Sequence, residues 1–316
     1  MHSSKALILG GTGFVGRHVC EKLHRQGWAL TLPTRHVSHA TAVQHLPRLT
    51  AMEVDLHAPG ALEQLLPGHD AVVNLVAVLH GNEARFEKTH VQLVGKIAAA
   101  CAASGVRRLI HISALGAAED SPSMYQRSKA RGEALLRAAG LDLTVLRPSV
   151  IFGHGDRFLN LFAQLQRLFP VMPLACASAR FQPVWVEDVA HAVLHCLEDS
   201  TTINQIYECA GPEVLTLAEL VRLAGRFGSQ ERPVIPLPMG LGRLQALMME
   251  LAPGEPLMSR DNLDAMQVDN IASGACLGLA ALGIVPASVS AVAPAYLGQR
   301  NARSHLLNLR EGKRHR

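Results

Sequence analysis

The chain has 316 residues, of which 48% are hydrophobic and 18% charged, with a mean hydropathy of +0.16. This composition excludes intrinsic disorder, which combines low hydrophobicity with high net charge. The formal charge of +4 is spread along the chain, and this argues against a nucleic-acid-binding protein with a basic stripe. The six cysteines lie far apart without a CxxC pair. We therefore expect reduced thiols rather than a disulfide framework or a structural zinc site.

The ends of the chain carry no expected targeting or membrane-spanning segment. An apolar strand pattern follows Lys5 at once, which leaves no room for a signal peptide. The uncharged segment 270–299 is rich in Ala and Gly and contains Pro286 and Pro294, unlike a spanning helix of ~20 strongly apolar residues. We expect a cytoplasmic protein and leave association with a membrane surface open. The basic residues of the tail are expected to be solvated: Arg310, Lys313, Arg314 and Arg316.

The first half of the chain alternates short apolar runs with helical patterns, which predicts a parallel sheet covered by helices on both faces. Helices are clearest at 14–24, 90–104 and 128–139. This order is typical of a doubly wound α/β fold of the Rossmann type. The predicted strands are 6–9, 29–32, 51–54, 71–78, 108–112 and 143–146.

Beyond Arg147 the pattern is less regular and predicts a second, smaller part. We expect a dinucleotide-binding Rossmann domain at 1–150, with 181–210 returning to it. A smaller C-terminal α/β lobe at 151–180 and 211–316 is expected to carry the substrate or a partner. The helix predicted at 241–251 has an apolar stripe, which we expect to face the core, with a partner or membrane surface as the alternative. The stripe consists of Leu241, Leu244, Leu247, Met248 and Leu251.

A glycine turn joins the first predicted strand to the first helix. In this context Gly10 permits a tight turn, Gly13 lets the backbone approach a pyrophosphate, and Gly16 permits close helix packing. The helix N-terminus adds free N–H groups and a positive dipole. The sequence therefore predicts a dinucleotide site, formed by Gly10, Thr12, Gly13, Phe14, Val15 and Gly16.

The end of the second strand indicates which dinucleotide binds. NAD sites usually place a carboxylate there for the ribose 2′-OH, whereas this chain has Arg35. A guanidinium suits a 2′-phosphate, and Arg17 is placed to assist. We therefore expect NADP(H) in preference to NAD(H), which stays possible. Asp55 and Leu56, after the third strand, are expected at the adenine.

Tyr125 and Lys129 lie four residues apart at the start of a predicted helix, so they share one face. A nearby ammonium favours the phenolate and should lower the phenol pKa from ~10. Lys129 is also expected to bind the nicotinamide ribose. Ser113 ends the fifth strand and is expected to position a substrate oxygen, with Ser123 as a weaker substitute. These three residues, Ser113, Tyr125 and Lys129, are the candidate catalytic group.

Two histidines, His191 and His195, have the i, i+4 spacing of paired metal ligands. No third ligand is placed convincingly, so we expect a helix face and no metal site. A loop containing His154 and Asp156 is a candidate substrate loop.

These motifs resemble the short-chain dehydrogenase/reductase superfamily over about residues 4–195. Further pieces resemble its extended and atypical branches, among them Asn74-Leu75-Val76-Ala77, which implies that Ala77 contacts the cofactor. Within those branches the chain is most similar to the NADPH-binding accessory subunits of respiratory complex I and their bacterial relatives. The stretch Ser259-Arg260-Asp261-Asn262-Leu263 supports that similarity.

The chain also departs from the sugar epimerases and dehydratases of the extended branch. Those enzymes usually have a double serine after strand five, where this chain has Ser113-Ala114. They usually begin the helix before strand five with an Asn near the active site, where this chain has His90. Both departures weaken a nucleotide-sugar function without affecting cofactor binding.

Three functions stay open at this stage. The first is an NADP(H)-dependent oxidoreductase that transfers hydride to or from a small-molecule carbonyl or alcohol. The second, implied by the resemblance, is a cofactor-holding subunit or assembly factor with a respiratory-chain partner, where NADPH stabilises the fold. The third is a nucleotide-sugar epimerase or dehydratase. A sensor of the NADPH/NADP⁺ ratio would need very different affinities for the two forms.

Overall fold

The computed structural model describes residues 4–252, 254 and 256–297. Its centre is an eight-stranded parallel sheet of order β14-β11-β6-β5-β4-β1-β2-β3. The direction of winding reverses between β1 and β4, and the carboxyl ends of the strands at such a point form the usual ligand crevice. The strands are β1 (Lys5–Leu9), β2 (Ala29–Thr34), β3 (Leu49–Glu53), β4 (Ala71–Asn74), β5 (Arg108–Ile112), β6 (Asp142–Pro148), β11 (Gln205–Cys209) and β14 (Leu277–Gly278).

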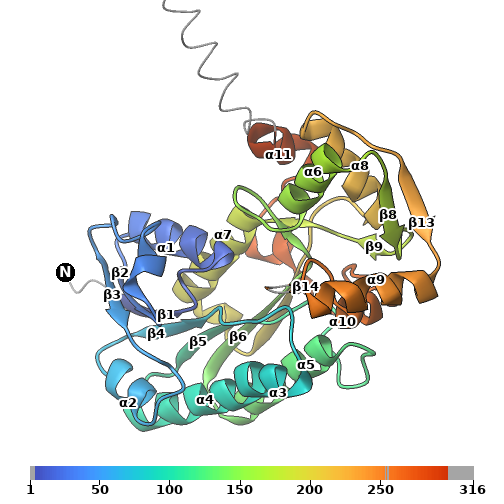
Figure 1. Cartoon of the computed structure of the whole chain (residues 1–316). Helices are drawn as coiled ribbons and strands as arrows, with labels where there is room; N and C mark the ends of the chain where they lie inside the picture. Colours follow the sequence, from blue (N-terminus) through green and yellow to red (C-terminus); the bar gives the residue numbers. More distant parts are fainter. Residues whose placement is uncertain (1–3, 253, 255, 298–316) are drawn as a thin grey trace, which may run out of the picture.

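Helices cover both faces of this sheet (Figure 1). On one face, α1 (Phe14–Arg25) and α7 (Val186–Glu198) pack over a core that includes Ile8. On the other face, α2 (Ala61–Leu65), α4 (Leu93–Ser104) and α5 (Met124–Ala138) pack over a core that includes Leu7 and Leu9. Successive residues of a strand point to opposite faces, so a strand buried on both sides is apolar throughout. The predicted Rossmann-type, doubly wound α/β fold is confirmed.

The predicted elements differ from the observed ones mainly at their ends. The strand at 108–112 is β5 as predicted, but the strand predicted at 71–78 ends at Asn74. Its side-chain oxygen accepts a hydrogen bond from the Val76 N–H at 3.2 Å, which turns the chain out of the sheet. The helix predicted at 128–139 begins already at Met124, because the Ser123 hydroxyl caps it by accepting from the Gln126 N–H.

The predicted helix at 90–104 is preceded by further helical turns. A short helix, α3 (Glu83–Phe86), leads into a π-helical segment, Glu87–Gln92, and this segment continues into α4. Single π-helical turns within longer helices are rare and often lie at functional sites.

The other described elements form a smaller lobe with its own core, which includes Phe152, Phe162 and Leu220. Its strands pair in three short two-stranded sheets. The strands are β7 (Ile151–Phe152), β8 (Met172–Ala175), β9 (Arg180–Phe181), β10 (Val184–Trp185), β12 (Leu215–Thr216) and β13 (Val234–Leu237). The helices are α6 (Leu159–Leu168), α8 (Leu217–Phe227), α9 (Met239–Leu251), α10 (Arg260–Ala265) and α11 (Val289–Leu297).

Two expectations about the second half need correction. β14 pairs with β11 in the main sheet, although all of 211–316 was assigned to the smaller lobe. A two-residue strand in a stretch rich in Ala and Gly has no periodic pattern that would reveal it. The apolar stripe of α9 does not face the core: Leu244 is 55% and Met248 67% exposed, and the helix buries Gly242 and Ala246 instead. Periodicity shows that one face is apolar but not what covers it.

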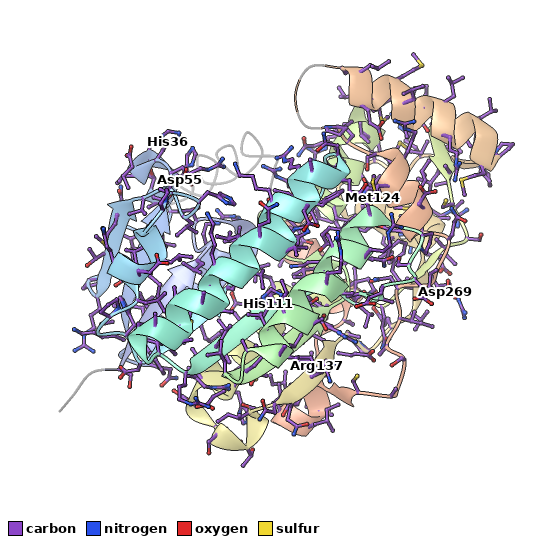
Figure 2. All side chains as sticks on the ribbon, turned by 90° about the horizontal axis from the view of Figure 1, so that it is seen from below. His36, Asp55, His111, Met124, Arg137 and Asp269 are labelled. Carbon is purple, nitrogen blue, oxygen red and sulfur yellow. The ribbon has the colours of Figure 1, made fainter. Side chains whose placement is uncertain are left out.

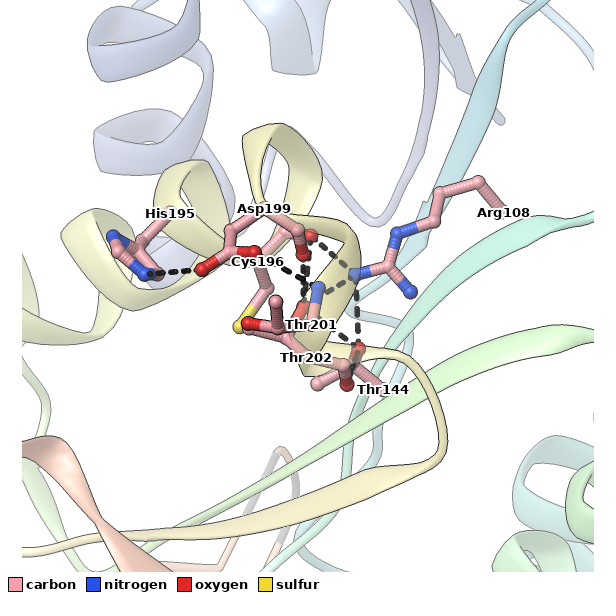
Figure 3. Close-up of polar contacts among 7 residues, drawn as sticks. All are labelled: Arg108, Thr144, His195, Cys196, Asp199, Thr201 and Thr202. Atoms are coloured by element: carbon pink, nitrogen blue, oxygen red, sulfur yellow. Dashed lines mark hydrogen bonds and ion pairs between the residues drawn. The ribbon is translucent and has the colours of Figure 1, made fainter. Parts of the chain in front are cut away.

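A half-buried arginine at the amino end of β5 connects the sheet to α7 (Figure 3). The Arg108 guanidinium donates to the Cys196 carbonyl, and it donates to the Thr144 and Thr202 hydroxyls at 2.9 Å each. In the next turn His195 pairs with Asp199 at 3.4 Å. This network lies at the end of the sheet opposite the ligand crevice, so it serves the fold.

Among the described residues, no helix is long and apolar enough to cross a membrane. The basic tail residues Arg310, Lys313, Arg314 and Arg316 lie outside the described residues.

Candidate functional site

The glycine turn has the geometry that a dinucleotide site needs. Gly10 has φ +82°, and a Cβ there would lie 2.9 Å from the Leu75 carbonyl carbon. A Cβ on Gly16 would lie 2.5 Å from the Gly10 carbonyl oxygen, so only glycine lets α1 approach β1 this closely. Gly13 is exposed and precedes the first residue of α1. Its open backbone at a helix N-terminus fits a pyrophosphate. Thr12, Phe14 and Val15, from the same turn, are partly buried beside it.

The residues expected at the adenosine end lie at one edge of the sheet. Arg35 and Asp55 are exposed and follow β2 and β3, and Figure 2 shows Asp55 and the neighbouring His36 at the same corner of the molecule. Burial lowers the pKa of His57 there, and the charges of Lys88, Lys96 and Arg35 lower it further, while Asp55 opposes them. This corner is therefore rich in positive charge, as an additional phosphate requires.

Three further cofactor candidates lie along the crevice. Leu56 is half-buried and packs against the core beneath α4, and Ala77 is exposed after β4. Arg17 lies beside the loop that follows β7: its guanidinium is 2.9 Å from where a Cβ of Gly155 would stand. The loop after β7 is thereby held close to the first turn of α1.

Lys129 and Ser113 meet at the carboxyl end of β5. The Lys129 ammonium is buried and donates to the Ile112 carbonyl at 2.8 Å, next to Ser113 in the chain. Burial lowers the pKa of Lys129 to about 8, although the Glu133 carboxylate opposes this. The Ser113 hydroxyl is also buried, and none of the described residues hydrogen-bonds to it. Buried hydroxyls are rarely left without a partner, so this one fits a bound ligand oxygen.

Tyr125 lies in the first turn of α5, and its ring packs edge-on against His90 with 5.4 Å between the ring centroids. Burial raises the pKa of the Tyr125 phenol. The nearby charge of Lys129 predicts the opposite direction for this pKa, so that expectation was wrong. It could not foresee how deeply the phenol is enclosed, and desolvation disfavours the phenolate. Tyr125 and Lys129 both lie in α5, and burial disfavours the phenolate form of Tyr125.

Sequence reasoning missed the residue that anchors this helix start. The Asp261 carboxylate, from α10, accepts hydrogen bonds from the Ser123 hydroxyl at 2.9 Å and the Met124 N–H at 2.6 Å. It also accepts from the Tyr125 N–H at 3.2 Å. Ser123 is thus engaged as a helix cap and is not available to replace Ser113. The fragment around Asp261 was singled out as a family motif, but its contact could not be read from one sequence.

A second missed group is a set of buried polar side chains beneath α4 and α5. His111 is fully buried; the Asn74 amide donates to its Nδ1 at 3.1 Å, and none of the described residues hydrogen-bonds to its Nε2. Burial lowers the pKa of His111 well below its usual value, helped by the charge of Lys129. The buried Glu133 carboxylate forms an ion pair with the half-buried Arg147, with a shortest distance of 2.5 Å. His111 is labelled near these helices in Figure 2.

Within the part of the chain that the structure describes, no cluster of three or more His, Cys, Asp or Glu side chains could hold a metal ion.

Comparison with known proteins identifies the family. A family model described as NAD(P)H-binding matches residues 10–161. The mitochondrial NADH dehydrogenase [ubiquinone] 1 alpha subcomplex subunit 9 of Mus musculus is 31% identical over 290 residues, which cover 89% of this chain and 76% of the mouse protein. The chain belongs to the epimerase/dehydratase-like short-chain dehydrogenase/reductase family. Residues 10–161 of this family member are a domain that binds nicotinamide dinucleotides.

Other family members are named as enzymes. The ceramide reductase of Caulobacter vibrioides is 33% identical over 187 residues, covering 58% of this chain and 57% of that protein. A crystal structure of UDP-glucuronic acid 4-epimerase from Bacillus cereus, with UDP-glucuronic acid and NAD, superposes with a TM-score of 0.67 at 16% identity. It covers 93% of this chain and 99% of the epimerase chain, and at that identity the likeness concerns the fold alone.

Proposed function

We propose that the protein is an NADP(H)-dependent oxidoreductase in which Tyr125, Lys129 and Ser113 act on a carbonyl or alcohol substrate. The proposal rests on the buried Ser113 hydroxyl at the end of β5, which lies near the Lys129 ammonium and has no hydrogen-bond partner among the described residues. In the division of labour that we propose, residues 1–150 and 181–210 bind the nucleotide. Residues 151–180 and the described residues beyond 210, apart from β14, shape the substrate side.

The chemistry follows from the states of these groups. When bound, the nicotinamide supplies or accepts a hydride at the substrate carbon. In the reducing direction, Ser113 donates a hydrogen bond to the substrate carbonyl oxygen, and Tyr125 transfers its proton to that oxygen. A phenol whose pKa is raised by burial is protonated and ready for this step. Lys129 then stabilises the phenolate until solvent returns the proton.

The proposed preference for NADP(H) over NAD(H) rests on the adenosine end of the crevice. Arg35 follows β2 where an NAD site usually has a carboxylate. Lys88, Lys96 and Arg35 each lie near enough to His57 for their charges to lower its pKa. A 2′-phosphate carries two negative charges that this corner can pair with, whereas a 2′-OH does not need them.

The Tyr125→Phe variant tests the catalytic assignment. The purified protein is screened with NADPH against a panel of aliphatic and aromatic ketones. For a ketone that the wild type reduces, we expect Tyr125→Phe to lower kcat by at least ~10²-fold and to leave NADPH affinity within about twofold. The other tyrosines, Tyr207 and Tyr296, are buried and offer no matched control. The exposed Arg137, at the far end of α5, is therefore replaced by Ala as the control. Unchanged turnover in Tyr125→Phe contradicts the assignment.

A second candidate function is a cofactor-holding subunit that associates with a respiratory-chain complex. Two observations favour it: the mouse and Neurospora crassa relatives are named as NADH dehydrogenase or NADH-ubiquinone oxidoreductase subunits, and α9 exposes an apolar stripe that includes Leu241, Leu244 and Met248. Co-purification of a tagged chain with respiratory subunits tests it. A Leu244→Ser/Met248→Ser variant should lose them, while an equally exposed change elsewhere, Leu168→Ser, should not.

A further inference from the structure

His90 is a buried imidazole whose two ring nitrogens contact different parts of the crevice. Its Nε2 lies 3.1 Å from the Val78 backbone nitrogen, in the loop after β4, and its Nδ1 lies 2.8 Å from the Ser128 hydroxyl on α5. The ring also stacks on Phe86 and meets the Tyr125 ring edge-on. His90 is thus the link between the loop that follows Asn74 and the helix that carries Tyr125 and Lys129.

The partners of His90 determine its tautomer. A backbone N–H can only donate, so Nε2 must accept from Val78 and the ring proton must lie on Nδ1. Nδ1–H then donates to the Ser128 hydroxyl, which in turn donates to the Tyr125 carbonyl at 2.7 Å. The result is one directed chain of hydrogen bonds from Val78 through His90 and Ser128 to the backbone of Tyr125.

The surroundings also keep this imidazole uncharged. Burial and the charge of Lys129 lower the pKa of His90 to about 3. The backbone here is closely packed as well: a Cβ on Gly132, in α5, would lie 2.2 Å from the His90 carbonyl oxygen. The hydrogen bonds at both ring nitrogens favour a single neutral tautomer in this position.

We propose that His90 is a positioning residue that fixes the loop 75–78 and the helix that carries Tyr125 relative to each other. The proposal rests on the proposed function, in which that loop contacts the nucleotide and Tyr125 the substrate. Its two hydrogen bonds have separable effects. The bond from Val78 fixes the nucleotide side, and the bond to Ser128 fixes the backbone of Tyr125.

Three variants test this division. His90→Phe keeps an aromatic ring against Phe86 and Tyr125 but loses both hydrogen bonds, and Ser128→Ala loses only the link to Tyr125. Gln92→Ala, exposed on the same π-helical segment, is the control. We expect His90→Phe to raise the NADPH dissociation constant at least tenfold. Ser128→Ala should leave that constant within twofold and lower kcat severalfold, and Gln92→Ala should change neither. A purely structural role predicts equal effects of the two site variants on NADPH affinity, and that result overturns the proposal.

A measurement without turnover separates this proposal from the proposed function. The nitrogen-15 spectrum of labelled histidine, with His90→Phe assigning the signal, should show a neutral His90 ring protonated on Nδ1. A ring protonated on Nε2, or a charged ring at pH 6, overturns the proposed positioning role of His90. If His90→Phe fails to fold, the signal is assigned instead by its change in Ser128→Ala. If the wild type binds no NADPH, the proposed function fails. An Nδ1–H signal then still supports the hydrogen bonds from Val78 to His90 and from His90 to Ser128.

Discussion

The Asp261 carboxylate of the smaller lobe accepts a hydrogen bond from the Tyr125 N–H at 3.2 Å, at the first turn of α5. The first N–H groups of a helix have no partner within it, and a negative charge there is also favoured by the helix dipole. Asp261, 136 positions further along the chain, thus stabilises the start of the helix that carries the candidate catalytic Tyr125. The smaller lobe therefore contributes a carboxylate to the helix start that carries Tyr125.

Replacing this carboxylate should destabilise the protein and disturb Tyr125. We expect Asp261→Ala to lower the free energy of unfolding by ~1–3 kcal/mol, because it leaves the Ser123 hydroxyl and two backbone N–H groups without their acceptor. Asp261→Asn should lose less, since its amide oxygen still accepts. Urea unfolding measures both. Asp264→Ala, on the same helix, removes an exposed ion pair with Arg243 and an exposed hydrogen bond from the Gln267 side-chain amide, and should cost at most ~1 kcal/mol. Equal losses for Asp261→Ala and Asp264→Ala would argue against the stabilisation of the α5 start by Asp261.

Two buried, neutral histidines make the fold sensitive to acid. The pKa of His90 falls from 6.5 to about 3 on folding, and that of His111 is also lowered. Below pH 6.5 the unfolded chain therefore binds protons that the folded chain does not, so stability falls as the pH falls. Between its pKa in the folded protein and pH 6.5, each such histidine should lower the free energy of unfolding by ~1.4 kcal/mol for each unit by which the pH falls.

The His90→Gln variant isolates one of these contributions. Its free energy of unfolding should fall less steeply than that of the wild type between pH 6 and pH 4, by ~1.4 kcal/mol per pH unit. His45→Gln, at an exposed position, should keep the wild-type slope. Urea unfolding at four pH values gives both slopes. A wild-type slope in His90→Gln would mean that His90 binds a proton in the folded protein.

Two helical glycines give opposite predictions. Gly132→Ala should destabilise the protein by ~1–3 kcal/mol, because its Cβ would lie 2.2 Å from the His90 carbonyl oxygen and the backbone must shift. Gly95→Ala in α4 meets nothing closer than Leu135 at 3.9 Å, and should gain up to ~1 kcal/mol from helix propensity. Thermal unfolding compares them. Equal tolerance of both substitutions would mean that α5 does not press on the π-helical segment.

The parts of this protein that are local in sequence could be predicted, and the parts built across the chain could not. The turn of Gly10, Gly13 and Gly16 follows from spacing alone, because the strand, the turn and the helix are consecutive. So does the shared helix face of Tyr125 and Lys129. The acceptor role of Asp261 depends on how the lobe folds back, and one sequence contains no signal for that contact.

Burial was the other quantity that the sequence did not supply. The charge of Lys129 suggested a lowered pKa for Tyr125, but desolvation dominates and raises it. The stripe of α9 suggested a core face, yet Leu251 at its end is 78% exposed. Both errors have one cause, since periodicity and neighbouring charges do not report which other elements cover a residue.

The central claim is that this site prefers NADP(H), and a direct titration tests it. The purified protein is titrated with NADPH and with NADH, alongside Arg35→Ala and, as control, the remote Arg137→Ala. We predict a dissociation constant at least tenfold lower for NADPH in the wild type and in Arg137→Ala, and a ratio near one in Arg35→Ala. Equal or tighter binding of NADH by the wild type, or no binding of either nucleotide, would contradict the account.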